Sequence, residues 1–290
     1  MKLKLILTTT LLASTLLTAM APQARTLIQN KGSDTLVNVA QAWAEAYPKV
    51  NPDIAVAVSG GGSGTGIAAM INGTVDIANA SRSMKDKEKA LAEKNGQSPV
   101  EHVVGYYALA LFIHKDNPIK AMSLTQLKDI YARDPKVKKW SEMGITVPGC
   151  KDEIVVVSRQ NNSGTYAYFQ KTVLGKGGKY RQGTLDMHGS KDVADLVENT
   201  PCAIGYSGLA YATDHLKMVC IATDDADACV APSVATASDR SYPIARPLFM
   251  YTDGEPQGAI KEYMDWIMSD TGQCILVKKG YAPIHEVKCD

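Results

Sequence analysis

Two clusters of glycine, serine, threonine and asparagine, residues 59–66 and 158–165, each stand between a strand-like and a helix-like run. The strand-like runs are the branched apolar segments 54–58 and 154–157. A strand, a small-residue loop and a helix N-terminus together form an anion site, because the free N–H groups and the positive end of the helix dipole attract negative charge. Two such loops in one chain predict one oxyanion held between two lobes.

The N-terminus predicts export. Two early lysines precede an apolar stretch, residues 5–21, which is typical of a secretory signal peptide. A transmembrane anchor is the alternative, but the stretch is short and rich in threonine for a span of about 20 residues. We expect cleavage near Ala21 or Ala24, so that residues 1–24 are a signal peptide. The first cysteine is Cys150, so no lipid anchor is expected, and the mature protein should be free in the periplasm.

The charge balance argues against some partners. Without the two lysines of the signal peptide, 29 basic residues face 30 acidic ones, a net charge near −1. No basic field is left to recruit nucleic acid or an anionic membrane, so neither is expected as a partner. An apolar content of 45% can fill two cores in a chain of this length. We expect a monomer of two domains.

Strand-like and helix-like segments alternate along the chain, which indicates an α/β fold with a largely parallel sheet. Two apolar runs, residues 103–113 and 242–251, are candidates to cross from one lobe to the other. Two crossings imply a domain inserted in a domain. We expect lobe I to comprise 25–106 and 247–290, and lobe II to comprise 107–246.

One helix-like segment shows a clear apolar face. The spacing of three and four residues places these side chains on one side of a helix, which predicts core packing: Leu36, Ala40, Trp43 and Tyr47.

Six cysteines in an exported chain favour disulfides over thiols. No CxxC pair occurs, which argues against zinc or redox chemistry. Many connectivities are possible. Two pairs flank short segments and leave the remaining two cysteines together, so the expected bonds are Cys220–Cys229, Cys274–Cys289 and Cys150–Cys202.

Four short polar segments are candidates for ligand contact, because they follow strands and open α/β sheets bind ligands at strand carboxyl ends. The candidate anion-binding residues are Ser33, Asp34, Thr35, Ser63, Gly64, Thr65, Ser81, Arg82, Arg159, Ser163, Gly164 and Thr165.

Each candidate also has a structural interpretation. Ser33, Asp34 and Ser163 could be ordinary helix N-caps. Arg82 precedes a charged run and could be a surface residue, whereas Arg159 follows four apolar residues, which favours ligand contact. The glycines of segment 60–66 would cost ordering entropy that a plain turn does not require, so close backbone approach explains them better.

Enzyme motifs are incomplete. Gly66 is followed by isoleucine rather than the lysine of a phosphate-binding P-loop, and the segment 61–65 ends in threonine rather than the glycine of a nucleophile elbow. The five histidines lack metal-ligand spacing. We therefore expect no catalytic residues, no metal and no cofactor.

In combination, the polar segments resemble the phosphate-binding protein of the bacterial phosphate ABC transporter, the PstS family. The resemblance covers essentially the whole mature chain. The segments that carry it, in chain order, are 32–36, 60–66, 76–82, 158–165, 203–206 and 280–283.

The resemblance implies a type II periplasmic binding protein, with two α/β lobes joined by two hinge strands that close on one inorganic phosphate for delivery to the membrane permease of an ABC transporter. It implies contacts from the loop 33–35 and donors from Ser63, Arg159, Ser163, Gly164 and Thr165.

One feature departs from the best-known members. They carry an aspartate where this chain has Ser81 and a neutral residue where it has Asp34. Phosphate carries a proton near neutral pH and sulfate does not, so an ionised Asp34 in the site would accept from phosphate and repel sulfate.

Other functions stay open at this point. Another tetrahedral oxyanion, such as sulfate or molybdate, would suit the same loops. A secreted phosphate-ester hydrolase is a further alternative, although it would need a metal cluster or an activated nucleophile. A sensory or adhesive use of the same fold is also compatible with the sequence.

Overall fold

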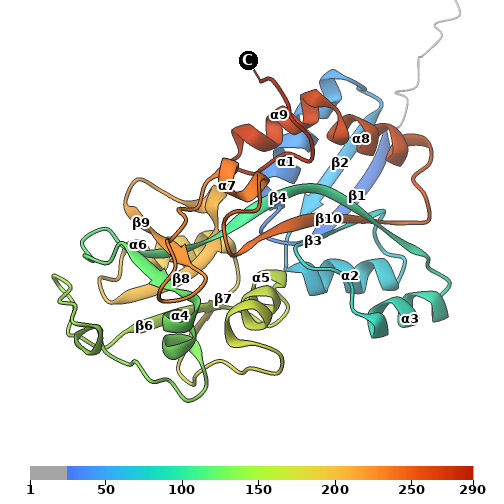
Figure 1. Ribbon diagram of the computed structural model, residues 1–290. Helices are drawn as coiled ribbons and strands as arrows, with labels where there is room; N and C mark the ends of the chain where they lie inside the picture. Colours follow the sequence, from blue (N-terminus) through green and yellow to red (C-terminus); the bar gives the residue numbers. More distant parts are fainter. Residues whose placement is uncertain (1–24, 290) are drawn as a thin grey trace, which may run out of the picture.

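Residues 25–289 are described by a computed structural model, in which two α/β lobes are joined by two long strands (Figure 1). The predicted signal peptide, residues 1–24, lies outside the described residues. Lobe I contains β1 (Thr26–Gly32), α1 (Val37–Ala46), β2 (Ile54–Ser59), α2 (Ser63–Ile71), β3 (Ile77–Ala80), α3 (Asp86–Lys94), α8 (Gly258–Met268) and α9 (Asp270–Lys278). Lobe II contains β5 (Ala121–Ser123), α4 (Leu124–Tyr131), β6 (Val155–Arg159), α5 (Gly164–Phe169), β7 (Leu185–Met187), α6 (Ser190–Glu198), β8 (Ala203–Gly208), β9 (Leu216–Ala222) and α7 (Val234–Ser238).

Lobe I is a three-layer unit. Helices α1, α8 and α9 cover one face of its sheet, and α2 and α3 cover the other (Figure 1). The predicted apolar face of α1 is confirmed, because Leu36, Ala40, Trp43 and Tyr47 are all buried. The Trp43 indole N–H donates to the Gly272 carbonyl at 2.8 Å, which ties α1 to α9. The helix gives way at Tyr47–Lys49 to a 3₁₀ turn that contains a proline.

The two connecting strands are β4 (Pro99–His114) and β10 (Ala245–Asp253). They pair antiparallel with each other over the first part of β4, as far as Ala108. From Leu109 onward β4 pairs with β8 of lobe II. Both apolar runs that were predicted to cross between lobes therefore belong to crossing strands, and the lobe boundaries expected at 106/107 and 246/247 remain a prediction.

The sheet is mixed rather than largely parallel, which corrects the sequence-based expectation. Strands β1, β2 and β3 are parallel, but β10 runs antiparallel to both β3 and β4. The reason is topological. The chain enters lobe II along β4 and returns along β10, so the two adjacent crossing strands must run in opposite directions.

Lobe II is organised around an aromatic stack. The ring of Phe169 on α5 lies parallel to that of Tyr206 on β8, with centroids 4.0 Å apart. The Tyr206 hydroxyl lies 2.7 Å from Ser158 Oγ and 2.8 Å from the Tyr180 hydroxyl. Burial raises the pKa of Tyr206 above its ordinary value. This stack fixes β6 and α5 relative to each other and so positions the loop between them.

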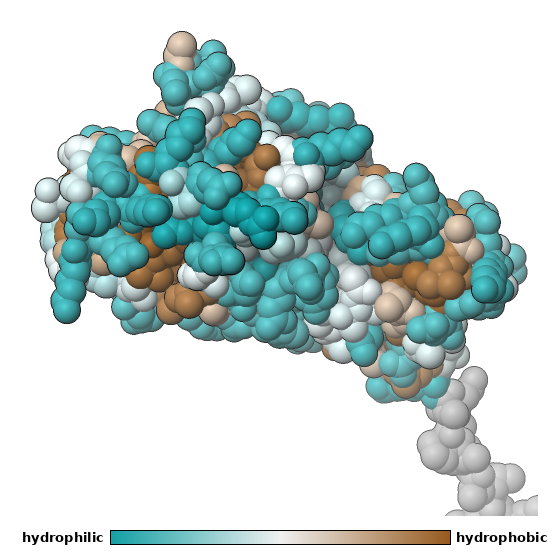
Figure 2. All heavy atoms as spheres, turned by 90° about the horizontal axis from the view of Figure 1, so that it is seen from below, coloured by the Kyte–Doolittle hydropathy of each residue, from teal (hydrophilic) through white to brown (hydrophobic). Residues whose placement is uncertain are grey.

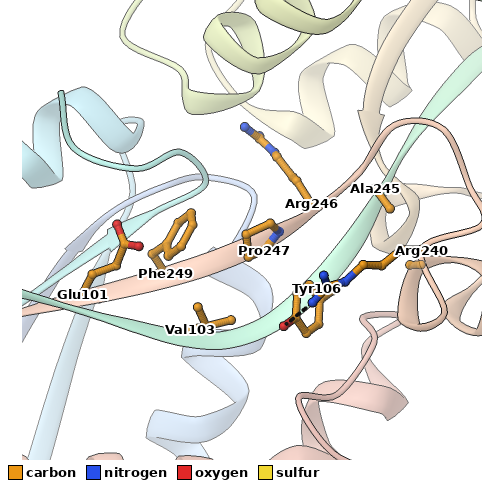
Figure 3. A pocket seen from close by; sticks show the side chains of 9 residues that line it. Glu101, Val103, Tyr106, Arg240, Ala245, Arg246, Pro247 and Phe249 are labelled. Carbon is orange, nitrogen blue, oxygen red and sulfur yellow. Dashed lines mark hydrogen bonds between the residues drawn. The ribbon is translucent and has the colours of Figure 1, made fainter.

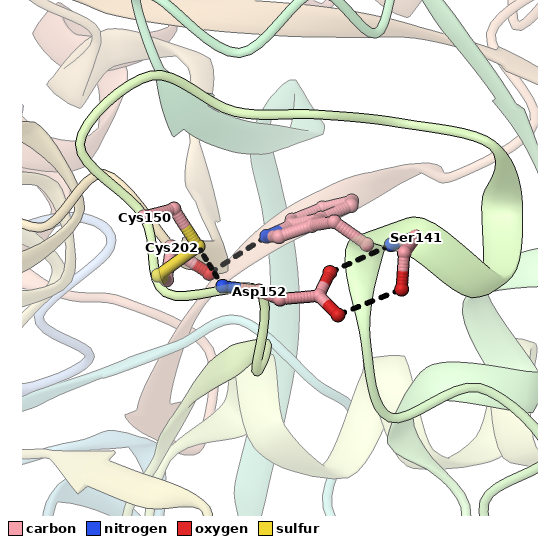
Figure 4. The surroundings of a disulfide bond; sticks show 5 residues. Ser141, Cys150, Asp152 and Cys202 are labelled. Carbon is pink, nitrogen blue, oxygen red and sulfur yellow. Dashed lines mark hydrogen bonds between the residues drawn. A yellow bond between two sulfur atoms is a disulfide. The ribbon is translucent and has the colours of Figure 1, made fainter.

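The three disulfides are those expected from the sequence: Cys150–Cys202, Cys220–Cys229 and Cys274–Cys289. Figure 4 shows the surroundings of the first, where the Asp152 carboxylate accepts from the backbone N–H and the hydroxyl of Ser141 at 2.8 and 2.7 Å. Each disulfide joins two cysteines of the same lobe, so the bonds leave the lobes free to move relative to each other.

The surface seen in Figure 2 is mostly polar, with apolar side chains in separate patches and a narrower waist between the two lobes. None of the helices within residues 25–289 is both long enough and apolar enough to cross a bilayer.

Candidate anion site

The four candidate loops lie at the carboxyl ends of β1, β2, β3 and β6, where the two lobes meet. The hydroxyls of Thr35 in lobe I and Thr165 in lobe II are 2.9 Å apart, and both side chains are fully buried. The loops that were predicted from two separate parts of the chain are therefore in direct contact.

Three serine hydroxyls from three different loops form one buried cluster. Ser33 Oγ donates to Ser81 Oγ at 2.9 Å, and Ser63 Oγ lies 3.2 Å from Ser81 Oγ. The backbone N–H of Ser81 donates to Ser63 Oγ at 2.9 Å. Gly164 of the other lobe lies against this cluster, because a Cβ there would collide with Ser63 Oγ and lie only 2.6 Å from Ser81 Oγ.

Arg159 is almost fully buried at the end of β6, with 1% exposure. Its Nη1 donates to Ser190 Oγ at 2.9 Å, and its Nη2 donates to the His188 carbonyl at 2.6 Å and to Asp34 Oδ2 at 3.0 Å. Burial lowers the pKa of Arg159, and the Asp34 carboxylate acts in the opposite direction. The Arg159 guanidinium is thus held where the two lobes meet by hydrogen bonds to Ser190, His188 and Asp34.

Asp34 joins the two lobes. Its Oδ1 accepts from the backbone N–H of Gly61 at 2.9 Å, while its Oδ2 accepts from Arg159. The alternative that Asp34 merely caps α1 is wrong, because the N-cap residue is Leu36 and no side chain caps this helix. Asp34 is therefore an acceptor within the interface of the two lobes.

Ser163, in contrast, does cap a helix. Its Oγ accepts from the backbone N–H groups of Thr165 and Tyr166 at 3.1 and 3.4 Å, at the start of α5. A hydroxyl that accepts still has one proton to donate. The capping role and a donor role toward a ligand are therefore compatible for this residue.

Two candidates are turned to other partners. Arg82 makes two hydrogen bonds of 2.8 Å to the Glu88 carboxylate, which supports the interpretation of Arg82 as a structural residue. Thr65 Oγ1 donates to the Gly61 carbonyl at 2.6 Å, inside its own loop. Glu88 lies in the charged run that follows Arg82, so this ion pair could have been predicted from the sequence.

The glycine loop does permit close backbone approach, as predicted. Gly61 and Gly62 have φ of 112° and 91°, a region that favours glycine. The approaching group is Asn162 of lobe II, which sequence reasoning missed. The Asn162 carbonyl accepts from the Gly64 N–H at 2.8 Å, and its Nδ2 donates to the Gly61 carbonyl at 2.9 Å.

Arg246 was not among the residues predicted for the site and was considered only as part of a crossing strand. This arginine is 5% exposed, and its guanidinium donates to the Tyr107 hydroxyl, to the Gly164 carbonyl at 2.8 Å and to Thr165 Oγ1 at 3.1 Å. Its position, as a charged residue in the middle of the apolar run 242–251, could have indicated a functional role from the sequence.

Two tyrosines hold the loop that contains Asp34. The Tyr211 hydroxyl donates to the Asp34 carbonyl at 2.5 Å, and the Tyr281 hydroxyl donates to the Thr35 carbonyl at 2.5 Å. Burial raises the pKa of Tyr211 to about 12, so its proton stays available for this bond at neutral pH. Within residues 25–289, no group of three or more His, Cys, Asp or Glu side chains is placed to hold a metal ion.

Two hollows lie beside the crossing strands. One, of about 490 Å³, is lined by Tyr106, Arg240 and Phe249 among others and is shown in Figure 3. The other, of about 450 Å³, is lined by Arg82, Tyr168 and neighbouring residues. Both are open to the surface, whereas the serines of the candidate site are buried.

Two α/β lobes joined by two crossing strands, with buried polar loops meeting between them, define a two-lobe binding protein. The profile of the PBP superfamily domain matches residues 19–271. The chain belongs to this superfamily and, within it, to the PstS family of phosphate-binding proteins.

The relatives that support this assignment cover most of the chain. The phosphate-binding protein PstS of Pseudomonas aeruginosa is 34% identical over 268 residues, which span 89% of this chain and 83% of that protein. The PstS of Bacillus subtilis is 32% identical, with 89% and 80% covered. Among solved structures, a putative phosphate ABC transporter substrate-binding protein from Clostridium perfringens, with bound phosphate, is 30% identical with a TM-score of 0.80, and the match covers 90% of this chain and all of that one.

Proposed function

We propose that the protein binds inorganic phosphate between its two lobes and delivers it to the membrane permease of an ABC transporter. The observation that carries the proposal is the buried group of hydroxyls from both lobes, Ser33, Ser63, Ser81, Thr35 and Thr165, beside the paired Arg159. Family membership supports it, since relatives are named phosphate-binding proteins and one solved relative holds phosphate.

The proposed contacts come from both lobes. Hydroxyls and backbone N–H groups bind a phosphate oxygen without adding charge, and an arginine adds a charge-assisted bond. Several such bonds, each worth about 1.5–3 kcal/mol net, could reach the roughly 8 kcal/mol of micromolar affinity after ordering costs. The proposed donors are Ser33, Thr35, Ser63, Ser81, Arg159, Ser163, Gly164 and Thr165. Arg82, Thr65 and Gly64 are left out, because the side chains of the first two and the backbone N–H of Gly64 have other partners.

We assign Asp34 the role of accepting a hydrogen bond from the protonated oxygen of phosphate. Each of its carboxylate oxygens makes one hydrogen bond within the interface, and a carboxylate oxygen can accept a second. Sulfate has no proton to offer near neutral pH, so its oxygens would face the carboxylate with unrelieved repulsion. This arrangement favours phosphate over sulfate.

We further propose that the mature protein acts as a monomer in the periplasm, after removal of the signal peptide. The lobes would open about β4 and β10 to admit phosphate and close on it, since these two strands alone carry the chain between the sheets of the two lobes among the described residues.

A binding role rather than hydrolysis is proposed, because the serine hydroxyls bond one another and accept from backbone N–H groups instead of lying beside a base. Calorimetry of the mature protein, freed of phosphate by dialysis in denaturant and refolding, tests the function. We expect micromolar or tighter phosphate binding and much weaker sulfate binding. Equal affinity for sulfate would favour the broader oxyanion alternative, and turnover of a chromogenic phosphate ester would favour the hydrolase.

A further inference from the structure

Arg246 is a buried cation whose hydrogen-bond partners are all neutral. They are the Tyr107 hydroxyl, the Gly164 carbonyl and Thr165 Oγ1. Among residues 25–289, no carboxylate forms a salt bridge with it, whereas the Arg159 guanidinium is paired with Asp34. Aromatic faces surround the remaining surface, with the Tyr107 and Tyr168 ring centres 4.9 and 4.4 Å from the guanidinium carbon. An uncompensated buried charge is costly unless something else offsets it.

The hydrogen bonds also fix the direction of nearby protons. A guanidinium can only donate, so the Tyr107 and Thr165 hydroxyls accept from Arg246 and must send their own protons elsewhere. The Tyr107 hydroxyl lies 3.5 Å from Thr165 Oγ1, and Thr165 Oγ1 lies 2.9 Å from Thr35 Oγ1. The Thr165 proton is therefore directed away from the crossing strand and toward the interface of the lobes.

We infer that Arg246 is a positioning residue of the phosphate site. It makes Thr165 a donor toward the ligand and supplies the positive charge that gives the site a preference for dianionic over monoanionic phosphate. The inference rests on the proposed function. The Coulomb attraction of one positive charge for a dianion is twice that for a monoanion at the same distance, so the benefit of Arg246 grows with ligand charge.

The surrounding charged and titratable groups come from several elements. Tyr107 of β4, Tyr168 of α5 and Arg159 of β6 face Arg246 directly or act on it through space. The rims of the two hollows that Arg246 lines carry Glu101, Arg240, Arg82, Lys85 and Lys171. The side-chain types in this set ordinarily titrate outside the range of about pH 6 to 8, in which phosphate passes from mainly monoanionic to mainly dianionic. A change in the pH dependence of affinity on replacing Arg246 therefore reports its interaction with the charge of the ligand.

Arg240 offers a matched control. It also places its guanidinium over a tyrosine of β4, 5.1 Å from the Tyr106 ring centre, and donates to the Tyr106 hydroxyl at 3.2 Å. Figure 3 shows Arg240 beside Tyr106, with the Arg246 side chain directed away from both. Arg240 has the same chemistry but makes no hydrogen bond to the 163–165 loop.

The experiment measures phosphate affinity by calorimetry at pH 6 and pH 8 for the wild-type protein and for Arg246→Gln, Arg246→Lys and Arg240→Gln. We expect Arg246→Gln to weaken binding by about tenfold or more at pH 8 and by clearly less at pH 6. Arg246→Lys should keep the wild-type pH dependence at reduced affinity, because lysine retains the charge but lacks the planar guanidinium that donates to several acceptors at once. Arg240→Gln should match the wild type.

An equal loss at both pH values in Arg246→Gln would overturn the inference and leave Arg246 a structural residue. Failure of the wild-type protein to bind phosphate would instead contradict the proposed function. If Arg246→Gln melts below the assay temperature, Arg246→Lys decides. That variant keeps the charge, so its affinity for phosphate should change from pH 6 to pH 8 as in the wild type, and a loss of this pH dependence would overturn the inference.

Discussion

Asp34 Oδ2 and Arg159 Nη2 lie 3.0 Å apart and join the two lobes through an ion pair in which Arg159 is almost fully buried. The same carboxylate also accepts from the glycine loop of lobe I. One acidic side chain therefore links the loop after β1, the loop after β2 and the end of β6. The Asp34 charge, which is predicted to set selectivity, also contributes to holding the lobes together.

Replacing Arg159 tests the anion site. We expect Arg159→Ala to lower phosphate affinity at least tenfold, since a charge-assisted hydrogen bond is worth more than the ~1.4 kcal/mol of one decade. Circular dichroism should show a retained fold. Calorimetry that gives wild-type affinity for this variant would place the anion elsewhere.

Replacing Asp34 tests selectivity. Asp34→Asn keeps a side chain of the same shape but removes the charge and adds a donor, so sulfate should compete with phosphate more effectively than in the wild type. The variant also weakens the link to Arg159, so we expect phosphate affinity to fall as well. A competition assay measures the ratio of the two affinities, and an unchanged ratio would assign selectivity to another residue.

Asn162 should control how long the lobes stay closed. Its side chain and carbonyl both bond the glycine loop of lobe I. We expect Asn162→Ala to release phosphate several-fold faster in stopped-flow measurements, because one bond between the lobes is lost. Asn161→Ala is the matched control, since Asn161 is exposed. Identical release rates in the two variants would show that this contact has no role in closure.

Phosphate should compact the protein. The interface contains hydrogen bonds from both lobes, and β4 and β10 connect them. We expect a smaller radius of gyration by small-angle scattering with saturating phosphate than without it. Identical curves would argue against a cleft that opens and closes.

The disulfides should contribute strongly to stability. For Cys150–Cys202, which are separated by 52 residues, the loop-entropy model gives roughly 4 kcal/mol. We expect the double variant Cys150→Ala, Cys202→Ala to melt at a markedly lower temperature. Peptide mapping without reduction checks the pairing itself, and a free thiol in the native protein would be at odds with three bonds.

Local sequence patterns determined much of this protein. Strand, glycine loop and helix follow one another within a few residues, so the anion-type loops at 59–66 and 158–165 could be recognised directly. The sequence also predicted the apolar runs that form β4 and β10 and the apolar face of α1, because periodicity and length are local properties. The three cysteine pairs followed from an even count and from short intervening segments.

The tertiary structure alone decided which side chains meet. Asp34 could be assigned as a cap or as an interface acceptor only after the loops of two lobes were placed in space, since its partner Arg159 is 125 residues away. Asn162 and Arg246 were not predicted for the same reason. Asn162 contacts Gly61 of the other lobe, and Arg246 of the crossing strand β10 contacts Thr165, which is 81 residues away in the sequence. The partner of a polar group depends on distance in space, and sequence spacing does not encode that distance between separate lobes.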